Sequence, residues 1–297
     1  MSVTLRPYQQ AAVEGVRNAY RRGARAPLLV VPTGGGKTVV FSHISGAASG
    51  RGSRVHIVVH RRELIRQTSA KLTAAGVPHG IIAPGHTPRP EAVQVASVQT
   101  LARRIGDSRF PKPDLVVIDE AHHAVAGQWK TVAAAWPEAR LLGVTATPER
   151  MDGRGLGIDV GGVFDALVMG PTVAELVALG HLTETVVYAP AHGPDLSGVA
   201  VRGGDYDAAA LRRAMDQPTI TGDAVAHYQR LAPGQPAILF ATSVAHADAM
   251  ARVFRDRGWR AVSASGETPV AERDAAIAGL ATGQVQALGA CDLIPEG

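Results

Sequence analysis

Short apolar runs alternate with amphipathic stretches of helical length along most of the 297 residues. Runs that are apolar at consecutive positions are typical of strands buried on both faces, and helices between them indicate that the strands are parallel. The sequence therefore predicts an α/β fold with a parallel sheet. Five such runs occupy the first half: PLLVVP at 27–32, RVHIVVH at 54–60, VQVASV at 93–98, DLVVIDE at 114–120 and LLGVTAT at 141–147.

A second alternating series follows a glycine-rich stretch, 151–162, which we expect to form a loop. The chain is long enough for two domain-sized cores. We expect domains at 1–170 and 184–297, joined by a linker helix at 171–183. In the second series the apolar runs are 183–190, 237–242, 260–265 and 285–291, and the expected helices are 223–231, 245–258 and 270–280.

Composition excludes several classes of protein. One cysteine, Cys291, rules out a disulfide framework and a cysteine-rich zinc site. No apolar run approaches the roughly 20 residues of a membrane-spanning helix, and the N-terminus lacks a signal-peptide pattern, so we expect a cytoplasmic protein. The net charge of +4 comes mostly from arginine, which fits either phosphate binding or the codon bias of a GC-rich genome.

The strongest local motif is VVPTGGGKT, in which a predicted strand leads into three glycines and a helix opens at Lys37 and Thr38. Glycines let backbone N–H groups approach an anion, and the helix N-terminus adds its positive dipole end. The motif predicts a P-loop in which Lys37 reaches the β- and γ-phosphates and Thr38 ligates Mg²⁺. The strict pattern has glycine where this chain has Val31, so an ordinary strand-to-helix turn is the alternative.

The run DLVVIDEAHH places Asp119 and Glu120 at the carboxyl end of another apolar strand, where ligands bind in parallel sheets. A P-loop site needs one acid to hold Mg²⁺ and a base to orient the attacking water. Asp119 suits the first role and Glu120 the second, although an acidic pair after a strand can also be an ordinary turn. Together the two motifs predict a Mg-ATP site with Lys37, Asp119 and Glu120 as its catalytic residues.

These motifs and their order resemble superfamily 2 helicases and translocases of the DEAD/DEAH type, in particular RadD-like and restriction-motor-like DNA helicases with the DEAHH form. The resemblance covers nearly the whole chain and implies two tandem RecA-like P-loop domains and ATP-dependent movement on DNA. It also accounts for Val31, because PTGGGKT is the family's form of motif I. LRPYQQAAV resembles the adenine-sensing segment. The implied ATP contacts are Arg6, Gln9, Thr33, Gly34, Gly35, Gly36, Lys37 and Thr38.

Four further stretches resemble motifs that line the family's nucleic-acid groove: VVHRRELIRQ, ASVQTL, AILFATSVAHA and SASGETPVAER. Cations and hydroxyl or amide donors suit phosphate oxygens but carry no base information, so an RNA helicase is an alternative to the favoured DNA enzyme. The first stretch also fits a strand followed by a solvated helical turn. The implied contacts are His60, Arg61, Arg62, Ser97, Gln99 and Thr100 in the first domain, and Thr242, Ser243, Ser265 and Gly266 in the second.

The stretch VTATPER resembles motif III, which implies that Thr145 and Thr147, with His122, couple the ATP site to the cleft between the domains. Buried hydroxyls at a strand end are equally compatible with a structural role. The adjacent His122 and His123 are not expected to bind a metal, because neighbouring side chains diverge and spacing places no third ligand. Trp129 and Trp136 are expected in the core.

The family completes its ATP site with arginines of motif VI, Q-x-x-G-R-x-x-R, and such arginine fingers are worth about 10³ to 10⁵ in rate. No such segment follows Asp223, and ALGACDLIPEG at 287–297 resembles an interrupted motif V. We therefore expect a second domain that lacks its C-terminal part, and weak ATP hydrolysis. Motif VI would come from a missing segment or a separate chain. The non-enzymatic alternative is a nucleotide-responsive nucleic-acid-binding module completed by a partner chain.

Overall fold

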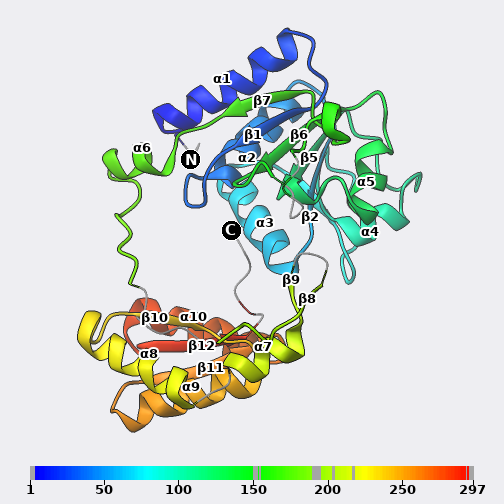
Figure 1. Ribbon diagram of the computed structural model, residues 1–297. Helices are drawn as coiled ribbons and strands as arrows, with labels where there is room; N and C mark the ends of the chain where they lie inside the picture. The colour runs from blue at the N-terminus through cyan, green and yellow to red at the C-terminus, as the bar shows by residue number, and fades with distance from the viewer. Residues whose placement is uncertain are drawn as a thin grey trace. The chain divides into compact units, whose positions relative to one another are not determined.

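The computed structural model describes residues 4–149, 153, 155–188, 195–202, 205–215, 218–291 and 293. Contacts divide the chain into two compact units, Met1–Thr185 and Val186–Glu296. Each unit contains its own parallel sheet with helices packed on it (Figure 1). The predicted α/β fold class is therefore confirmed.

The first unit is organised around a seven-stranded parallel sheet with the order β3-β4-β2-β5-β6-β1-β7. Every residue of β2, β4 and β5 is buried, as expected for strands covered on both faces. This burial is what their largely apolar runs predicted, and it includes the polar side chains of His56 and Gln94. The strands are β1 (Pro27–Val30), β2 (Val55–Val59), β3 (His79–Ile82), β4 (Val93–Ser97), β5 (Leu115–Asp119), β6 (Arg140–Thr145) and β7 (Ala166–Met169).

Helices cover both faces of this sheet. One core cluster joins it to α1 (Pro7–Arg21), α2 (Lys37–Ser49) and α3 (Arg62–Ala74), with Phe41 fully buried. The other cluster joins it to α4 (Val98–Arg103) and α5 (Gly127–Ala134). Two short 3-10 turns, η1 (Ala121–His123) and η2 (Ile158–Val160), and helix α6 (Val173–Ala178) complete the unit.

The second unit has a smaller parallel sheet with the order β10-β12-β11. Val225, Tyr228 and Phe254 pack α8 and α9 on one face, and Leu280 of α10 packs against Leu288 on the other. A two-stranded antiparallel ribbon, β8 with β9, precedes them. The elements are β8 (Val201–Arg202), β9 (Asp205–Tyr206), α7 (Ala208–Met215), α8 (Pro218–Leu231), β10 (Ala237–Phe240), α9 (Val244–Asp256), β11 (Ala261–Ser265), α10 (Val270–Thr282) and β12 (Ala287–Cys291).

Some elements differ from the sequence prediction. The apolar run at 183–190 was expected as a strand, but residues 183–188 form neither strand nor helix, and Val187 is 83% exposed. Positions 189–190 of that run lie outside the described residues. Strands β3 and β7, the β8–β9 ribbon and α7 were not predicted. In the expected loop 151–162, the described part contains η2, and positions 151, 152 and 154 lie outside it.

Two smaller expectations concern burial. Trp129 is buried, and Trp136 is partly buried against the same cluster, so both belong to the core as predicted. Cys291 is buried at the end of β12, where its small side chain fits the sheet interior. Across the part of the chain that the structure describes, no helix has both the length and the apolar character needed to cross a bilayer.

Candidate functional site

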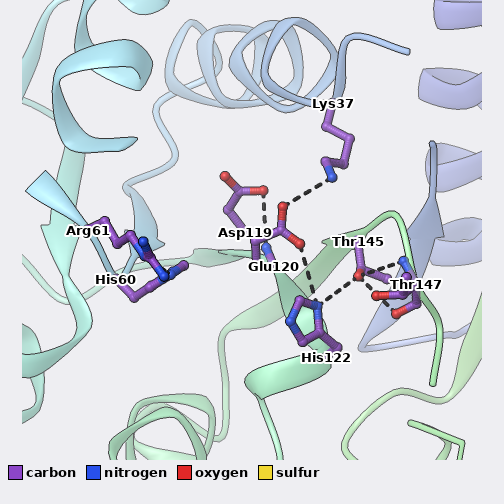
Figure 2. Close-up of polar contacts among 8 residues, drawn as sticks. All are labelled: Lys37, His60, Arg61, Asp119, Glu120, His122, Thr145 and Thr147. Atoms are coloured by element: carbon purple, nitrogen blue, oxygen red, sulfur yellow. Dashed lines mark hydrogen bonds and ion pairs between the residues drawn. The ribbon is translucent and has the colours of Figure 1, made fainter. Parts of the chain in front are cut away.

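The predicted ATP motifs meet at the carboxyl edge of the first sheet. Lys37 begins α2 just after β1, Asp119 ends β5 and Thr145 ends β6. Strand β6 pairs with both β1 and β5, so these three strand ends are adjacent. The topology therefore assembles one polar cluster from three segments far apart in the sequence, as Figure 2 shows.

The glycine loop before α2 has a shape that side chains would prevent. Gly34 and Gly36 have φ angles of 80° and 85°, in the left-handed region that favours glycine. A Cβ atom at Gly36 would lie 2.5 Å from Nε2 of Gln9, and one at Gly35 would lie 2.6 Å from Cγ1 of Val31. Val31 is thus accommodated because Gly35 has no side chain. The loop leaves the first N–H groups of α2 available to an anion.

The segment that resembles the family's adenine-sensing motif contacts this loop through Gln9. The Gln9 side chain is buried at 5% exposure, and its Oε1 accepts a hydrogen bond of 3.0 Å from the Arg6 backbone N–H. Arg6 is exposed, and its guanidinium donates to the Tyr8 hydroxyl at 3.3 Å. Both residues therefore lie at the start of α1, with Gln9 directly against the loop at Gly36.

Lys37 forms an ion pair with Glu120, with 3.1 Å between Nζ and Oε1 (Figure 2). Both side chains are about 10% exposed, so the pair is largely shielded from water. Glu120 has a φ of 52° and, within the described residues, is the one non-glycine residue with positive φ. Its backbone N–H donates to Oδ1 of Asp119 at 3.1 Å. Strained backbone of this kind persists where surrounding contacts enforce it, often at functional sites.

Burial raises the pKa of Asp119 to about 6, and the neighbouring carboxylate of Glu120 adds to the rise while Lys37 opposes it. Two acidic groups with one cation leave a local deficit of positive charge. Carboxylate and hydroxyl oxygens are the ligands that Mg²⁺ prefers, and Thr38 brings a hydroxyl to the first turn of α2. Asp119 and Thr38 therefore fit a magnesium ion chemically.

A polar chain continues from Glu120 toward the end of β6. Oε2 of Glu120 lies 3.5 Å from Nδ1 of His122, which lies 3.2 Å from Oγ1 of Thr145 (Figure 2). The Thr145 hydroxyl donates to the Thr147 carbonyl at 3.0 Å and accepts from the Thr147 N–H at 3.1 Å. Because the hydroxyl proton is used on Thr147, Thr145 can only accept from His122. The structure thus brings the three predicted coupling residues into one network with Glu120.

A cluster of rings lies beside this network, and the sequence interpretation missed it. His60 lies 5.4 Å from His123 and 6.2 Å from Trp129, measured between ring centroids, and His123 stacks on Trp129. Burial lowers the pKa of His60, with positive charge from His123 and Arg61 adding to the effect. The rings of His122 and His123 are 4.1 Å apart, so the expectation that they diverge was wrong. The second histidine of DEAHH, His123, was the feature of the sequence that could have indicated this ring cluster.

The other predicted nucleic-acid contacts of the first unit differ in exposure. Arg61 and Arg62 are exposed at the start of α3, and Arg61 donates to Nε2 of His60 at 3.1 Å. Gln99 is also exposed, and its Oε1 accepts a 2.7 Å hydrogen bond from the Ser97 hydroxyl. Ser97 is buried, and so is Thr100 in α4, at 8% and 9% exposure.

In the second unit the predicted contacts lie at the carboxyl ends of β10 and β11, which flank β12. Ser243 is the N-cap of α9, and its hydroxyl accepts the His246 N–H at 3.0 Å, while Thr242 lies just before it. The Ser265 hydroxyl accepts the Glu267 N–H at 3.2 Å, and Gly266 is exposed beside it. Of the stretch that resembles motif V, Cys291 and Leu293 are described, and positions 292 and 294–297 lie outside the described residues.

A glycine loop opening a helix, an acidic pair on a nearby parallel strand and two α/β units define a P-loop protein of RecA-like architecture. Residues 2–150, half of the chain, match the family described as type III restriction enzyme, res subunit. The chain belongs to this family, and the predicted relationship to superfamily 2 helicases of the DEAD/DEAH type is confirmed.

Relatives of known sequence and structure resemble most of this chain. A 51.5 kDa protein of a Lactococcus phage is 34% identical over 266 residues, which are 90% of this chain and 55% of the phage protein. The putative ATP-dependent helicase IRC3 of Saccharomyces cerevisiae is 29% identical over 313 residues, which cover 99% of this chain and 45% of the yeast protein. The chain thus spans about half the length of these relatives. The Pyrococcus furiosus Hef helicase domain shares the fold, with a TM-score of 0.54 and 14% identity. The match covers 95% of this chain and 86% of the Hef domain.

Proposed function

We propose that this chain is the ATP-binding core of a nucleic-acid helicase or translocase, which couples Mg-ATP hydrolysis to movement along a strand. The contact of Lys37 with Glu120, beside Asp119, carries the proposal, because it joins the two motifs that the chemistry requires. Family membership and the helicase name of the yeast relative support the same activity. The proposed organisation is an ATP-binding domain at 1–170, a linker at 171–183 and a second RecA-like domain at 184–297.

In the proposed reaction Lys37 exchanges Glu120 for the oxygens of the β- and γ-phosphates, which carry more negative charge. The exchange frees the Glu120 carboxylate to orient a water molecule and to accept its proton. Thr38 and Asp119 would hold magnesium, which when bound supplies positive charge against the phosphate oxygens. The triphosphate would follow the loop from Thr33 through Gly34, Gly35 and Gly36, and Arg6 and Gln9 would contact the base.

The nucleic-acid strand would contact the carboxyl edges of both sheets. Arg61, Arg62 and Gln99 are exposed there and can donate to phosphates as they lie, and Ser243 keeps a hydroxyl proton that can do the same. Ser265 also belongs to the proposed set and keeps a hydroxyl proton, but it is buried at 6% exposure. The proposed set also includes His60, Ser97, Thr100, Thr242 and Gly266. The network of His122, Thr145 and Thr147 would transmit the state of Glu120 to this surface.

Hydrolysis by these 297 residues alone should be slow, because no Q-x-x-G-R segment follows Asp223 to supply an arginine finger. We expect that adding a segment or chain with motif VI raises the hydrolysis rate about 10³- to 10⁵-fold. Rapid turnover by the 297 residues alone would show that this part of the proposal is wrong.

The test is ATP hydrolysis measured with no nucleic acid, with single-stranded DNA and with RNA of the same sequence. We expect a low basal rate that DNA raises more than RNA does, since the resemblance favours DNA. Equal stimulation by both would shift the proposal to an enzyme of mixed specificity. If ATP changes the affinity for DNA while no hydrolysis is detected, the chain is instead a nucleotide-responsive binding module.

A further inference from the structure

A second basic surface lies at the amino edge of the first sheet, at the other end of the strands from the candidate nucleotide site. It consists of two adjoining hollows of about 540 Å³ and about 740 Å³, which share Ser53, Asp114 and Arg140. Asp114 precedes β5 and Arg140 begins β6, so the position at the amino edge follows from the topology. We name these two hollows the amino-edge hollows. Their cations are Arg17, Arg21, Arg51, Arg54, Lys112 and Arg140.

Most of these cations have no acidic partner among the described residues. Glu14 forms ion pairs with both Arg17 and Arg21. The side chains of the other four cations form no ion pair with any of the residues that the structure describes. The acids of the lining are Asp114 and Glu138, and Asp114 accepts the backbone N–H of Arg54 at 2.8 Å. The surface therefore has an excess of cations that a bound polyanion would offset.

One of these cations is held in place. The guanidinium carbon of Arg140 lies 5.0 Å from the ring centroid of Tyr20, and the Tyr20 hydroxyl donates to the carbonyl of Leu141 at 3.0 Å. The ring is thus fixed to the start of β6, and a cation over its face loses less conformational freedom on binding. Ile44, which is partly exposed, contributes apolar surface to the first hollow, against which a sugar ring can pack.

We propose that the amino-edge hollows bind the sugar-phosphate backbone of duplex nucleic acid, at a site separate from the groove at the carboxyl edges. The cations come from several segments and extend across two hollows, which suits a repeating anion. Guanidinium groups pair with phosphate in a bidentate way, and such contacts are independent of sequence. An acidic protein segment is the competing ligand. Binding at the amino-edge hollows requires no ATP hydrolysis, so it can be tested independently of the proposed motor activity.

The experiment measures how salt weakens binding of a short fluorescent duplex DNA to the full chain by anisotropy. Arg61→Gln with Arg62→Gln provides a background with weakened binding at the carboxyl edge. Into it we place Arg51→Gln with Lys112→Gln, one residue from each hollow. The matched control is Arg89→Gln with Lys130→Gln, which removes the same charge from exposed positions of the same unit that line neither hollow.

Each phosphate contact contributes about 0.9 to the slope of log K against log salt, so losing two contacts should reduce the slope by about 2. The control pair should leave it unchanged, and Arg51→Lys should preserve it because the charge remains. Thermal unfolding of each variant shows whether it is folded. If the hollow pair and the control pair changed the salt slope equally, the proposed site would be wrong, because the cations would then act only through net charge.

Two further ligands make the test specific. A single strand of the same sequence, bound with a smaller loss in the Arg51 and Lys112 variant, would agree with duplex as the ligand. An equal loss for both would overturn the preference for duplex. An acidic peptide that loses affinity in this variant, with duplex binding unchanged, would overturn the proposal in favour of a protein partner. ATP hydrolysis stimulated by single-stranded DNA, measured in parallel, tests the motor activity independently.

Discussion

The carboxyl edges of the two sheets carry different chemistry, although both sheets are parallel and flanked by helices. In the first unit this edge holds ionisable groups in mutual contact, Lys37 with Glu120 and Glu120 with His122. In the second it holds neutral hydroxyls, Ser243 and Ser265, which accept N–H groups of their own turns. The same architecture thus carries the cluster proposed to act on a nucleotide in one unit, and hydroxyls that cap local turns in the other.

The sheets also differ in how their strands are covered. Strands β2, β4 and β5 of the first sheet are buried at every residue, whereas in the second sheet the central strand β12 alone is, and the edge strand β10 alternates and leaves Phe240 70% exposed. Full burial removes water from the strand ends, which strengthens electrostatic interactions and shifts pKa values. The raised pKa of Asp119 is an example. A charged site is therefore most effective on the first sheet.

The largest expected effect is that of Glu120→Gln. The amide cannot accept a proton from water, so turnover should fall about 10²- to 10⁴-fold while ATP binding persists. Steady-state hydrolysis and binding of a fluorescent nucleotide measure the two quantities. Glu184→Gln, an exposed position of the same unit, is the control and should change neither. Unchanged turnover in Glu120→Gln would contradict a catalytic role for the carboxyl edge of the first sheet, and with it the proposed difference between the two sheets.

The buried interior of the first sheet predicts a pH effect on stability. Burial lowers the pKa of His56 from 6.5 to about 4. Between these values the unfolded chain binds the proton first, so stability is kept above pH 6.5 and is lost as pH falls toward 4. The contribution of His56 should decrease by about 2 kcal/mol from pH 7.5 to pH 5.

Urea unfolding at both pH values measures this change. His56→Phe should remove about 2 kcal/mol of the pH dependence, and the exposed control His86→Gln should retain it. Equal pH dependence in the two variants would contradict the assignment to His56.

A smaller effect is expected from Thr145→Val, which deletes the hydroxyl that links His122 to Thr147. Loss of hydrogen bonds worth about 1.4 kcal/mol corresponds to about a tenfold lower rate in the presence of DNA. The fall should be greater with DNA than without it, because the network is proposed to transmit the state of Glu120. Thr131→Val, on the exposed side of α5, is a matched control. An equal fall in both rates would assign Thr145 a structural role.

The smallest effect concerns the second unit. Ser243→Ala removes the N-cap of α9 and should lower the free energy of unfolding by about 1 kcal/mol. Ser243→Asp keeps a cap acceptor but places a negative charge where a phosphate is proposed. It should retain stability and lose DNA affinity. If both variants bind DNA like the wild type, Ser243 serves only as a cap and the second unit has one contact fewer.

The sequence was sufficient to predict those strands that are apolar at most consecutive positions. β1, β2, β4, β5 and β6 are such strands, and the motifs at their ends follow from the rule that sites lie at carboxyl edges. β7 was missed because it is an edge strand with alternating burial, beside a glycine-rich stretch. The run at 183–188 was wrongly expected to be a strand, because β-branched residues indicate a strand only where neighbours exist to cover them.

The site shows a similar division. Lys37, Asp119 and Glu120 were identifiable because their chemistry depends on residue type and on position after a strand. The left-handed backbone of Glu120 and the stacking of His123 on Trp129 were not, since both depend on contacts between distant segments. Such contacts are set by tertiary packing rather than by local pattern.

The measurement that tests the central claim most directly is the ATP hydrolysis rate with single-stranded DNA in the wild type and in Lys37→Ala. Removing the ammonium group takes away the charge proposed to hold the phosphates, so we expect the DNA-dependent rate to fall about 10²- to 10³-fold. Lys130→Ala, an exposed lysine of the same unit, should leave it unchanged. A DNA-dependent rate that is the same in Lys37→Ala and the wild type would contradict an ATP site at the carboxyl edge of the first sheet.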